Sequence, residues 1–274
     1  MTNTYVHPTA GLAGRLFARL ANSRRIAAAR RAVFSRLPFV TLESDVRDVV
    51  YLTWMMDAAT AQAMVPAGVR LWQRNGLTPF SILTYRHGHF GPSLAGPARR
   101  LMPSPLQSNW RFYLEEPGKV YFVRNVMDST LHVLGTRIFS DILRTHLAAL
   151  FVHARDGEAY TTAIDPGAGS APLLEARARV SGLRDLPKGL AGAFASWEEA
   201  VSFLACQHTA MIEVPGLGRM AESEISLPIP LDEVLPLEVQ SVACPTAGAD
   251  AGPPFCFAVP RVRFRVLSES LAAS

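Results

Sequence analysis

The chain of 274 residues has few cysteines and no long hydrophobic run. Three cysteines occur, at positions 206, 244 and 256, without paired spacing. An odd number of this kind argues against a disulfide framework and for a reducing compartment, so we expect a cytoplasmic protein. No uncharged apolar run reaches the length of about 18 residues that a membrane-spanning helix needs. The first ten residues are polar, and no secretory signal pattern follows them.

Acidic residues are absent from residues 1–42, although that segment holds seven arginines. Without these seven of the 27 basic residues, 20 remain against 23 acidic ones, which gives the rest of the chain a net charge of −3. The positive charge therefore belongs to an N-terminal appendage and not to the body. Because phosphate backbones are recognised by positive charge on a folded face, we do not expect nucleic acid as a partner.

Residues 11–37 have the pattern of a basic amphipathic helix. Leu12, Leu16 and Leu20 recur at helical spacing with arginines between them, and Ser23 can cap a second half that ends before Pro38. Three interpretations remain open for this arm. It packs on the domain or on a second subunit of a homo-oligomer, it contacts an anionic membrane surface, or it is a transit peptide.

Beyond the arm, short strands alternate with turns. The sequence predicts strands at 49–54, 69–73, 79–85, 108–114, 120–125, 220–229 and 255–267, with further strands within 151–184. It predicts helices at 57–64, 129–150 and 197–204, and loops at 88–106 and 245–254. Many strands, few helices and no βαβ rhythm indicate an antiparallel α+β fold or a partly closed barrel.

Several ordered blocks of the sequence resemble one family. They are VRDVVYLTWMMDAATAQAMVP (46–66), QSNWRFYL (107–114), the segment 120–147, WEEAVSFLACQHTAMIEV (197–214) and ESEISLPIPLDEVLPLEV (222–239). Over roughly residues 45–267 the chain resembles the acetoacetate decarboxylase-like superfamily, in particular its uncharacterised DUF2071 or YqjF-like branch. The resemblance implies an α+β fold, a mostly antiparallel, cone-shaped β-barrel with a few packing helices around a pocket. It divides the chain into an arm, residues 1–42, and a barrel domain, residues 43–270, that we expect to fold without the arm.

The resemblance places Arg47 and Asp48 at the pocket. In the decarboxylases an Arg at the position of Arg47 holds a substrate carboxylate, a task that suits the two parallel donors of a guanidinium. Spacing alone favours a surface ion pair at the start of a strand. The resemblance shifts the expectation to the pocket.

Polar and aromatic residues alternate along the strand predicted at 107–114. With a period of two, one face carries Gln107, Asn109, Arg111 and Tyr113, and the other carries Trp110, Phe112 and Leu114. A polar face normally points to water, but the resemblance assigns this one to the pocket. Gln107 stands where the branch commonly has an acidic residue, so a base is lost there although an amide can still orient a substrate. Ser81, on the predicted strand 79–85, joins this set.

The family's catalytic lysines have no counterpart. The decarboxylases use two adjacent lysines, one of which forms a Schiff base, and the matching positions here are Leu143 and Arg144. Arginine stays protonated and cannot form the imine. The only lysines are Lys119, beside a Pro-Gly turn, and Lys188, in a loop. The Schiff-base decarboxylation is therefore not expected.

Two other motifs give only weak indications of a metal site or a catalytic pair. His87-Gly-His89 has the spacing of two metal ligands on one strand face, but no third ligand has a recognisable spacing, so no metal is expected. Cys206 and His208 point to different sides of a helix and pair poorly. No Gly-rich phosphate loop occurs, and no cofactor is expected.

The sequence thus predicts an enzyme acting on a carboxylate or carbonyl metabolite without a Schiff-base lysine, of isomerase, dehydratase, cyclase or hydrolase type. The residues expected in catalysis are Arg47, Arg111 and Asn109. The residues expected to bind the ligand are Asp48, Gln107, Tyr113 and Ser81. Two alternatives remain, a non-catalytic barrel that binds small molecules and an interaction protein docked through its basic helix.

Overall fold

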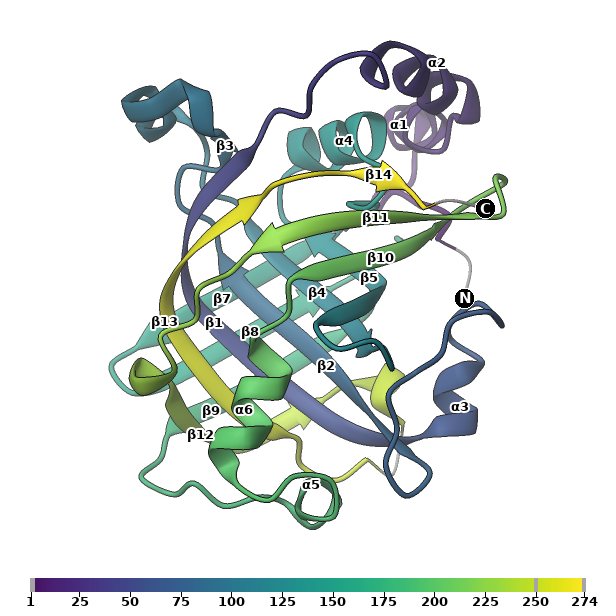
Figure 1. Ribbon diagram of the computed structural model, residues 1–274. Helices are drawn as coiled ribbons and strands as arrows, with labels where there is room; N and C mark the ends of the chain where they lie inside the picture. The colour runs from purple at the N-terminus through teal and green to yellow at the C-terminus, as the bar shows by residue number, and fades with distance from the viewer. Residues whose placement is uncertain (1–2, 249–250, 273–274) are drawn as a thin grey trace.

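The computed structural model describes residues 3–248 and 251–272 (Figure 1). It is a mixed α+β structure made mostly of strands. Its helices are α1 (Leu12–Ala21), α2 (Arg24–Phe34), α3 (Ala58–Gln62), α4 (Thr130–Phe139), α5 (Lys188–Ala191) and α6 (Trp197–Ala205). Short 3-10 helices occur at η1 (Ser93–Leu101), η2 (Leu231–Glu233) and η3 (Pro245–Ala247). Residues 249–250 of the predicted loop 245–254 lie outside the described residues.

Seven strands within the described residues pair into a closed ring. In order of pairing they are β1 (Leu42–Asp57), β2 (Leu77–Arg86), β4 (Leu106–Tyr113), β5 (Lys119–Met127), β10 (Thr209–Val214), β11 (Arg219–Ser226) and β13 (Phe255–Val266). The ring closes because β13 pairs with β1 along its length and with β11 at Ile225 and Ser226. Only the contact between β5 and β10 is parallel in this ring.

A second layer of strands extends from β13 over the outside of the ring. β12 (Leu235–Ala243) pairs with β13 and is followed by β9 (Leu174–Val180), β8 (Ala159–Asp165) and β7 (Leu150–Asp156). Short strands β3 (Gly91–Pro92), β6 (Thr145–Leu147) and β14 (Ser270–Leu271) complete the sheet. One hydrophobic core lies between the two layers, and another fills the ring.

β4 is buried on both faces, which explains its unusual composition. Trp110 and Phe112 belong to the core between the layers, whereas Tyr113 belongs to the core inside the ring. All eight residues of the strand are buried. The alternation predicted from the sequence therefore places one face of β4 in the core inside the ring and the other in the core between the layers. Neither face points to solvent.

A β-bulge interrupts β1 at Asp48. Its φ of 53° is left-handed, and the register to β2 shifts between Arg47 and Val50. Because a bulge adds one residue to one strand, the side-chain alternation changes phase there. Val46 and Val49 both face the inner core, and Arg47 is exposed between them.

The N-terminal arm forms two helices, as predicted, with Ser23 as the cap of α2. The Ser23 hydroxyl accepts a hydrogen bond from the Ile26 amide at 3.3 Å. The arm packs on α4 (Figure 1), and Tyr5, 1% exposed, shares a small core with Val133 and Leu147. Arg31 of α2 also pairs with the buried Asp141. These contacts support the interpretation in which the arm packs on the domain.

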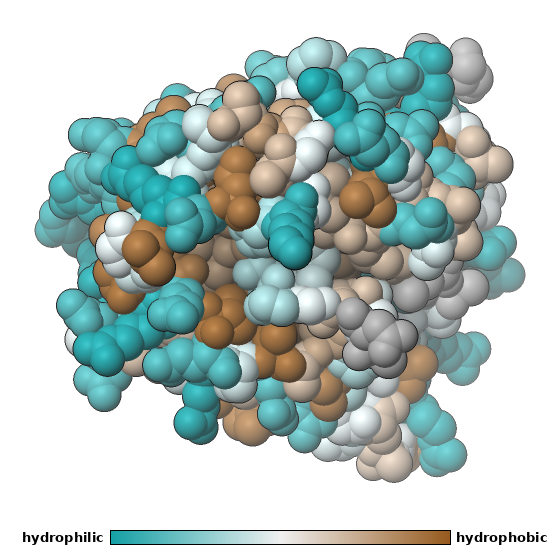
Figure 2. All heavy atoms as spheres, turned by 90° about the horizontal axis from the view of Figure 1, so that it is seen from below, coloured by the Kyte–Doolittle hydropathy of each residue, from teal (hydrophilic) through white to brown (hydrophobic). Residues whose placement is uncertain are grey.

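The outer face of the arm carries exposed leucines. Leu12, Leu16 and Leu20 are 77%, 59% and 39% exposed on the side of α1 away from the domain. The membrane-surface and homo-oligomer interpretations therefore stay predictions. No helix among the described residues is long and apolar enough to cross a membrane. At the opposite end, near α5 and α6, hydrophobic side chains lie between hydrophilic ones (Figure 2).

Three predicted elements differ from the structure. The predicted loop 88–106 contains β3 and the 3-10 helix η1. The helix predicted at 129–150 ends at Phe139, because Ser140 is extended, and the chain continues through β6 into β7. The strand predicted at 69–73 is reduced to a single bridge between Leu71 and Leu114. In the turn after it, Asn75 and Gly76 both take positive φ, a conformation that an Asn-Gly pair adopts readily.

Candidate functional site

A cavity of about 390 Å³ lies inside the ring, and α4 lines it at one end. Most of its walls are apolar side chains from the ring strands and from the segment after α4. Phe39, Leu131 and Phe139 form its rim, and these three side chains are 41%, 73% and 61% exposed. The cavity therefore opens to solvent through an apolar rim.

Arg111 brings a positive charge into this cavity. It is 3% exposed, and none of the ion pairs within the described residues includes it. Its Nη2 donates at 2.7 Å to the Leu204 carbonyl in the last turn of α6, which also accepts from the Tyr113 hydroxyl at 3.0 Å. Its Nε has no hydrogen-bond partner among the described residues. The guanidinium is thus held by the protein at Nη2, and its Nε is an unused donor.

Tyrosines surround Arg111. Its Cζ lies 5.3 Å from the ring centre of Tyr113 and 5.7 Å from that of Tyr51. Burial alone lowers the pKa of Arg111, but the oxygens of Tyr113 and Tyr51 outweigh it, and the net direction is upward. Burial also raises the pKa of Tyr51, so its phenol stays protonated. The Tyr51 hydroxyl interacts with the Arg111 guanidinium but makes no hydrogen bond of good geometry among the described residues, so its proton is a second donor beside Arg111.

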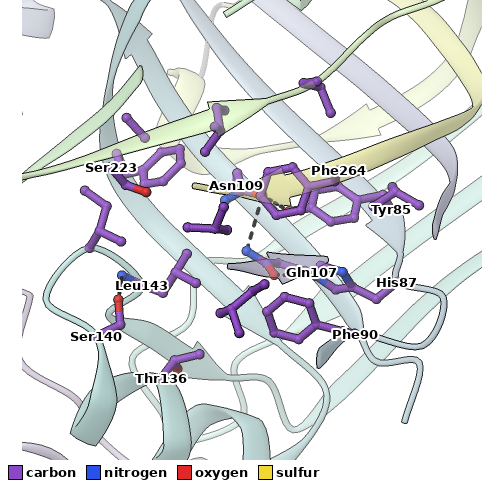
Figure 3. A pocket seen from close by; sticks show the side chains of 18 of the residues that line it. Tyr85, His87, Phe90, Gln107, Asn109, Thr136, Ser140, Leu143, Ser223 and Phe264 are labelled. Atoms are coloured by element: carbon purple, nitrogen blue, oxygen red, sulfur yellow. Dashed lines mark hydrogen bonds between the residues drawn. The ribbon is translucent and has the colours of Figure 1, made fainter. Parts of the chain in front are cut away.

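A chain of hydrogen bonds runs along the cavity wall from β2 to β4 (Figure 3). His87 Nε2 contacts Gln107 Oε1 at 2.7 Å, and Gln107 Nε2 donates to Asn109 Oδ1 at 3.5 Å. The Tyr85 hydroxyl donates to the same oxygen at 2.7 Å, and Asn109 Nδ2 donates to Asn125 Oδ1. This network fixes the Asn109 amide, whose carbonyl oxygen accepts two bonds.

His87 is neutral at physiological pH. It is 1% exposed, and burial lowers its pKa to about 4 despite the bond to Gln107. Its Nδ1 contacts the Ser44 hydroxyl at 2.8 Å, so both ring nitrogens are engaged. His87 therefore orients Gln107 and is not a free base.

The facing wall supplies other titratable groups. His132 of α4 lines the cavity with its Nδ1 2.7 Å from the Ser129 hydroxyl, and burial lowers its pKa. Glu269 also lines the cavity, and burial raises its pKa. Its carboxylate accepts hydrogen bonds from the Ser140 hydroxyl and the Asp141 amide. Thr136, Ser140 and Leu143 lie across the cavity from Gln107 and Asn109 (Figure 3).

Arg47, which the resemblance places at the pocket, does not lie in the ring cavity. Arg47 is exposed on the outside of the ring, and neither it nor Asp48 lines the cavity. The bulge at Asp48 is the cause, because without the extra residue Arg47 would share the inward face of Val49 and Tyr51. Asp48 instead lies 3.7 Å from Arg155 at the surface.

The other expected residues gather around β4. Gln107, Asn109 and Arg111 line the cavity. Tyr113 and Ser81 lie behind Arg111, where the Tyr113 hydroxyl donates to Ser81 Oγ at 2.9 Å, and neither lines the cavity. These two residues support Arg111 from the side of α6, and direct ligand contact by them is not shown by this geometry.

Neither lysine lines the cavity. Lys119 forms ion pairs with Glu116 at 2.8 Å and Glu222 at 3.0 Å, and Lys188 is exposed at the start of α5. Leu143, at one position of the missing lysine pair, lines the cavity, whereas Arg144 does not. Within the described part of the chain, no group of three or more His, Cys, Asp or Glu side chains is arranged to hold a metal ion.

Sequence reasoning missed Tyr51, Tyr85 and the role of His87. Tyr51 and Tyr85 stand at alternating positions with Val49 and Leu83 in the inner core, so period-two alternation on β1 and β2 was the available signal. Both strands are buried on both faces over most of their length, so their inner face cannot be told from sequence.

Comparison with known proteins shows the fold. No protein-family model and no curated protein matches the chain. An acetoacetate decarboxylase-like enzyme from Sphingomonas wittichii RW1 is similar in structure with a TM-score of 0.56, at 10% identity over 85% of this chain and 93% of that one. Acetoacetate decarboxylase from Legionella pneumophila gives 0.55, at 10% identity over 86% and 88%. The enduracididine biosynthesis enzyme MppR in complex with pyruvate gives 0.53, at 12% identity over 85% and 90%.

The chain has an acetoacetate decarboxylase-like fold. At these identities the likeness shows the fold alone, and the DUF2071 branch stays a prediction because no family model matches.

Proposed function

We propose that this protein is an enzyme of the acetoacetate decarboxylase-like fold that acts on an apolar carboxylate or carbonyl compound without a Schiff-base lysine. The observation that carries the proposal is the unused donor of a buried arginine, Arg111 Nε, at the wall of an apolar cavity. In this proposal the ring of strands is the cone-shaped barrel expected from the sequence, and its interior is the site.

A buried cation is stabilised by contact with an anionic or polarised oxygen. Leaving a buried charged donor unsatisfied costs about 1–3 kcal/mol or more, and a ligand oxygen removes that cost. Arg111 Nε and the Tyr51 hydroxyl are two neighbouring donors that can bind the same ligand oxygen or the two oxygens of a carboxylate. The apolar walls would receive the remainder of the ligand.

The same donors suit an oxyanion that develops during a reaction. A carbonyl compound that is enolised, dehydrated or hydrolysed gathers negative charge on oxygen, and fixed donors in a site of low dielectric stabilise it. Asn109, held by Tyr85 and Gln107, would orient the substrate through its second Nδ2 hydrogen. His132 and Glu269, on the facing wall, are the titratable groups available to move a proton.

An imine route is not part of the proposal, because neither lysine lines the cavity. MppR, which has a similar fold and whose structures include complexes with pyruvate and with a condensation product of pyruvate, supports the choice of a small carbonyl ligand. The non-catalytic alternative, a binding protein, uses the same cavity and differs only in the absence of turnover.

Binding of octanoate, compared with octan-1-ol, tests the site. We expect the natural protein to prefer the carboxylate, and Arg111→Met to lose roughly 10- to 150-fold in octanoate affinity, the equivalent of about 1.5–3 kcal/mol for a charge-assisted hydrogen bond. Binding of octan-1-ol should change little. Arg47→Met is the matched control, since that arginine is exposed outside the ring, and it should bind octanoate like the natural protein. Equal octanoate affinity in Arg111→Met would place the carboxylate elsewhere.

A further inference from the structure

A second cavity lies between the N-terminal arm and the domain, separate from the ring interior. It measures about 560 Å³, and its walls come from the arm, from β5, from the segment of α4 to β6, and from the end of β10. Five arginines line it: Arg24, Arg31, Arg124, Arg137 and Arg144. We call it the arginine cavity.

Arg144 is the least compensated of these side chains. It is 8% exposed, its Nε has no hydrogen-bond partner among the described residues, and none of their ion pairs includes it. The nearby carboxylate of Asp141 is already engaged, with one oxygen 2.7 Å from Arg30 and the other 2.7 Å from Arg31. Burial, partly offset by Asp141, lowers the pKa of Arg144.

Arg137 adds a second buried charge without a carboxylate. It is 2% exposed and donates to the carbonyl oxygens of Ala21, Thr145 and Asn3 at 3.2, 3.0 and 2.8 Å. Burial, followed by the charge of Arg144, lowers the pKa of Arg137 to about 9. Neutral carbonyls fix its position but do not cancel its charge.

The remaining lining does not supply the missing negative charge. The guanidinium of Arg24 lies over Gly216, where an added Cβ would come within 2.8 Å of it. Glu213 is the acidic side chain among the described lining residues, and it is exposed. Among the described lining residues, the positive charges of Arg24, Arg137 and Arg144 therefore exceed the negative charge of Glu213, and an anion would stabilise the packing of the arm on the domain.

We propose that the arginine cavity binds a phosphate group and thereby fastens the arm to the domain. A phosphate presents oxygens in several directions, so it can accept hydrogen bonds from guanidinium groups on different walls, which a planar carboxylate cannot do as well. The open volume exceeds that of one phosphate group, so the source is either free inorganic phosphate or a phosphomonoester with a small organic body.

The test measures binding of inorganic phosphate to the full chain by calorimetry and by thermal unfolding, with sodium chloride at equal ionic strength as the salt control. We expect saturable binding and a higher unfolding temperature with phosphate. Arg144→Gln and Arg24→Gln should each weaken phosphate binding by ten-fold or more. Arg179→Gln is the matched control because Arg179 pairs with Glu158 at the surface of another region, and it should bind phosphate normally.

Arg24 is exposed, so we expect Arg24→Gln to fold. It therefore tests phosphate binding even where Arg144→Gln does not fold. A tighter affinity for glycerol 3-phosphate than for phosphate would identify a phosphomonoester as the source, and equal affinities would identify the free ion. An effect of phosphate no larger than that of sodium chloride overturns the proposal. Phosphate binding that is unchanged in Arg24→Gln and in any folded Arg144→Gln protein overturns it as well.

Discussion

The two cavities lie on opposite sides of one short segment, and they differ in how their arginines are compensated. Leu143 lines the ring cavity, and the next residue, Arg144, lines the arginine cavity. The ring cavity has one buried cation, Arg111, held by tyrosines and the end of α6 within apolar walls. The arginine cavity has several cations and polar walls. The first suits a ligand with one polar end, and the second suits a compact anion.

Removing the arm should remove the arginine cavity and leave the ring cavity in place. Of the changes considered, we expect this one to lower the free energy of unfolding most. A chain that starts at Pro38 keeps Phe39 at the rim of the ring cavity but loses Tyr5 and Phe17, which pack on the domain. At about 1.5–3 kcal/mol for each large buried side chain, we expect the free energy of unfolding to fall by about 3 kcal/mol or more. Chemical denaturation measures this loss. Phosphate binding should disappear, and octanoate binding should persist. An unchanged stability would show that the contacts of the arm contribute little to the fold of the domain.

A fall in pH should lower the free energy of unfolding of the protein, because His87 must be protonated in the wall of the ring cavity. Because burial lowers its folded pKa from 6.5 to about 4, the unfolded chain binds the proton more readily between these values. Stability is then complete above pH 6.5 and is lost as the pH falls toward 4, by up to about 3 kcal/mol.

The control for this effect is His87→Gln, which cannot titrate. Its free energy of unfolding should fall less between pH 6.5 and 4 than that of the natural protein. His146 and His153 are also buried with lowered pKa values, so a smaller decline remains in the variant. Identical pH dependence in both proteins would mean that His87 is not buried as a neutral ring.

Titrating each variant with the ligand of the other cavity should show that the two cavities bind their ligands independently. Arg144→Gln should leave octanoate affinity within about 0.5 kcal/mol of the natural value, and Arg111→Met should do the same for phosphate affinity. Calorimetric titration of each variant with both ligands gives the four numbers needed. A large cross-effect would indicate coupling through the segment 140–147.

Borohydride treatment in the presence of pyruvate or acetoacetate should produce no covalent adduct of the protein. Lys119 is held by two glutamates, and Lys188 lies on the surface, so neither is a desolvated nucleophile inside the cavity. Intact-mass spectrometry followed by peptide mapping detects any reduced adduct. A stable adduct on either lysine would restore the imine route.

Part of this arrangement could be predicted from sequence. The alternation on β4 indicated that Gln107, Asn109 and Arg111 share one face, because a strand with two buried faces must still alternate. The arginine excess of residues 1–42 and the helix break at Asn22-Ser23 were also evident. These features are local, since each depends on neighbouring residues only.

What was missed depends on long-range packing. Asp48 takes a left-handed φ that Asp tolerates but that no neighbour signals, and this one residue turns Arg47 outward. The apolar spacing of 129–150 continues through Ile142, Leu143 and Leu147, yet these side chains fill the ring and the arm core from irregular and strand backbone. Tertiary contacts there outweigh helical periodicity.

The most direct test is a crystal structure of the protein with 8-bromooctanoate, in which the anomalous signal of bromine locates the end of the tail. We predict one strong site near Phe39, Leu131 and Phe139 at the rim, with the carboxylate within hydrogen-bond distance of Arg111 Nε and the Tyr51 hydroxyl. Bromine beside Leu204 with the carboxylate at the rim, or a ligand bound only in the arginine cavity, would contradict the assignment of Arg111 as the anion partner.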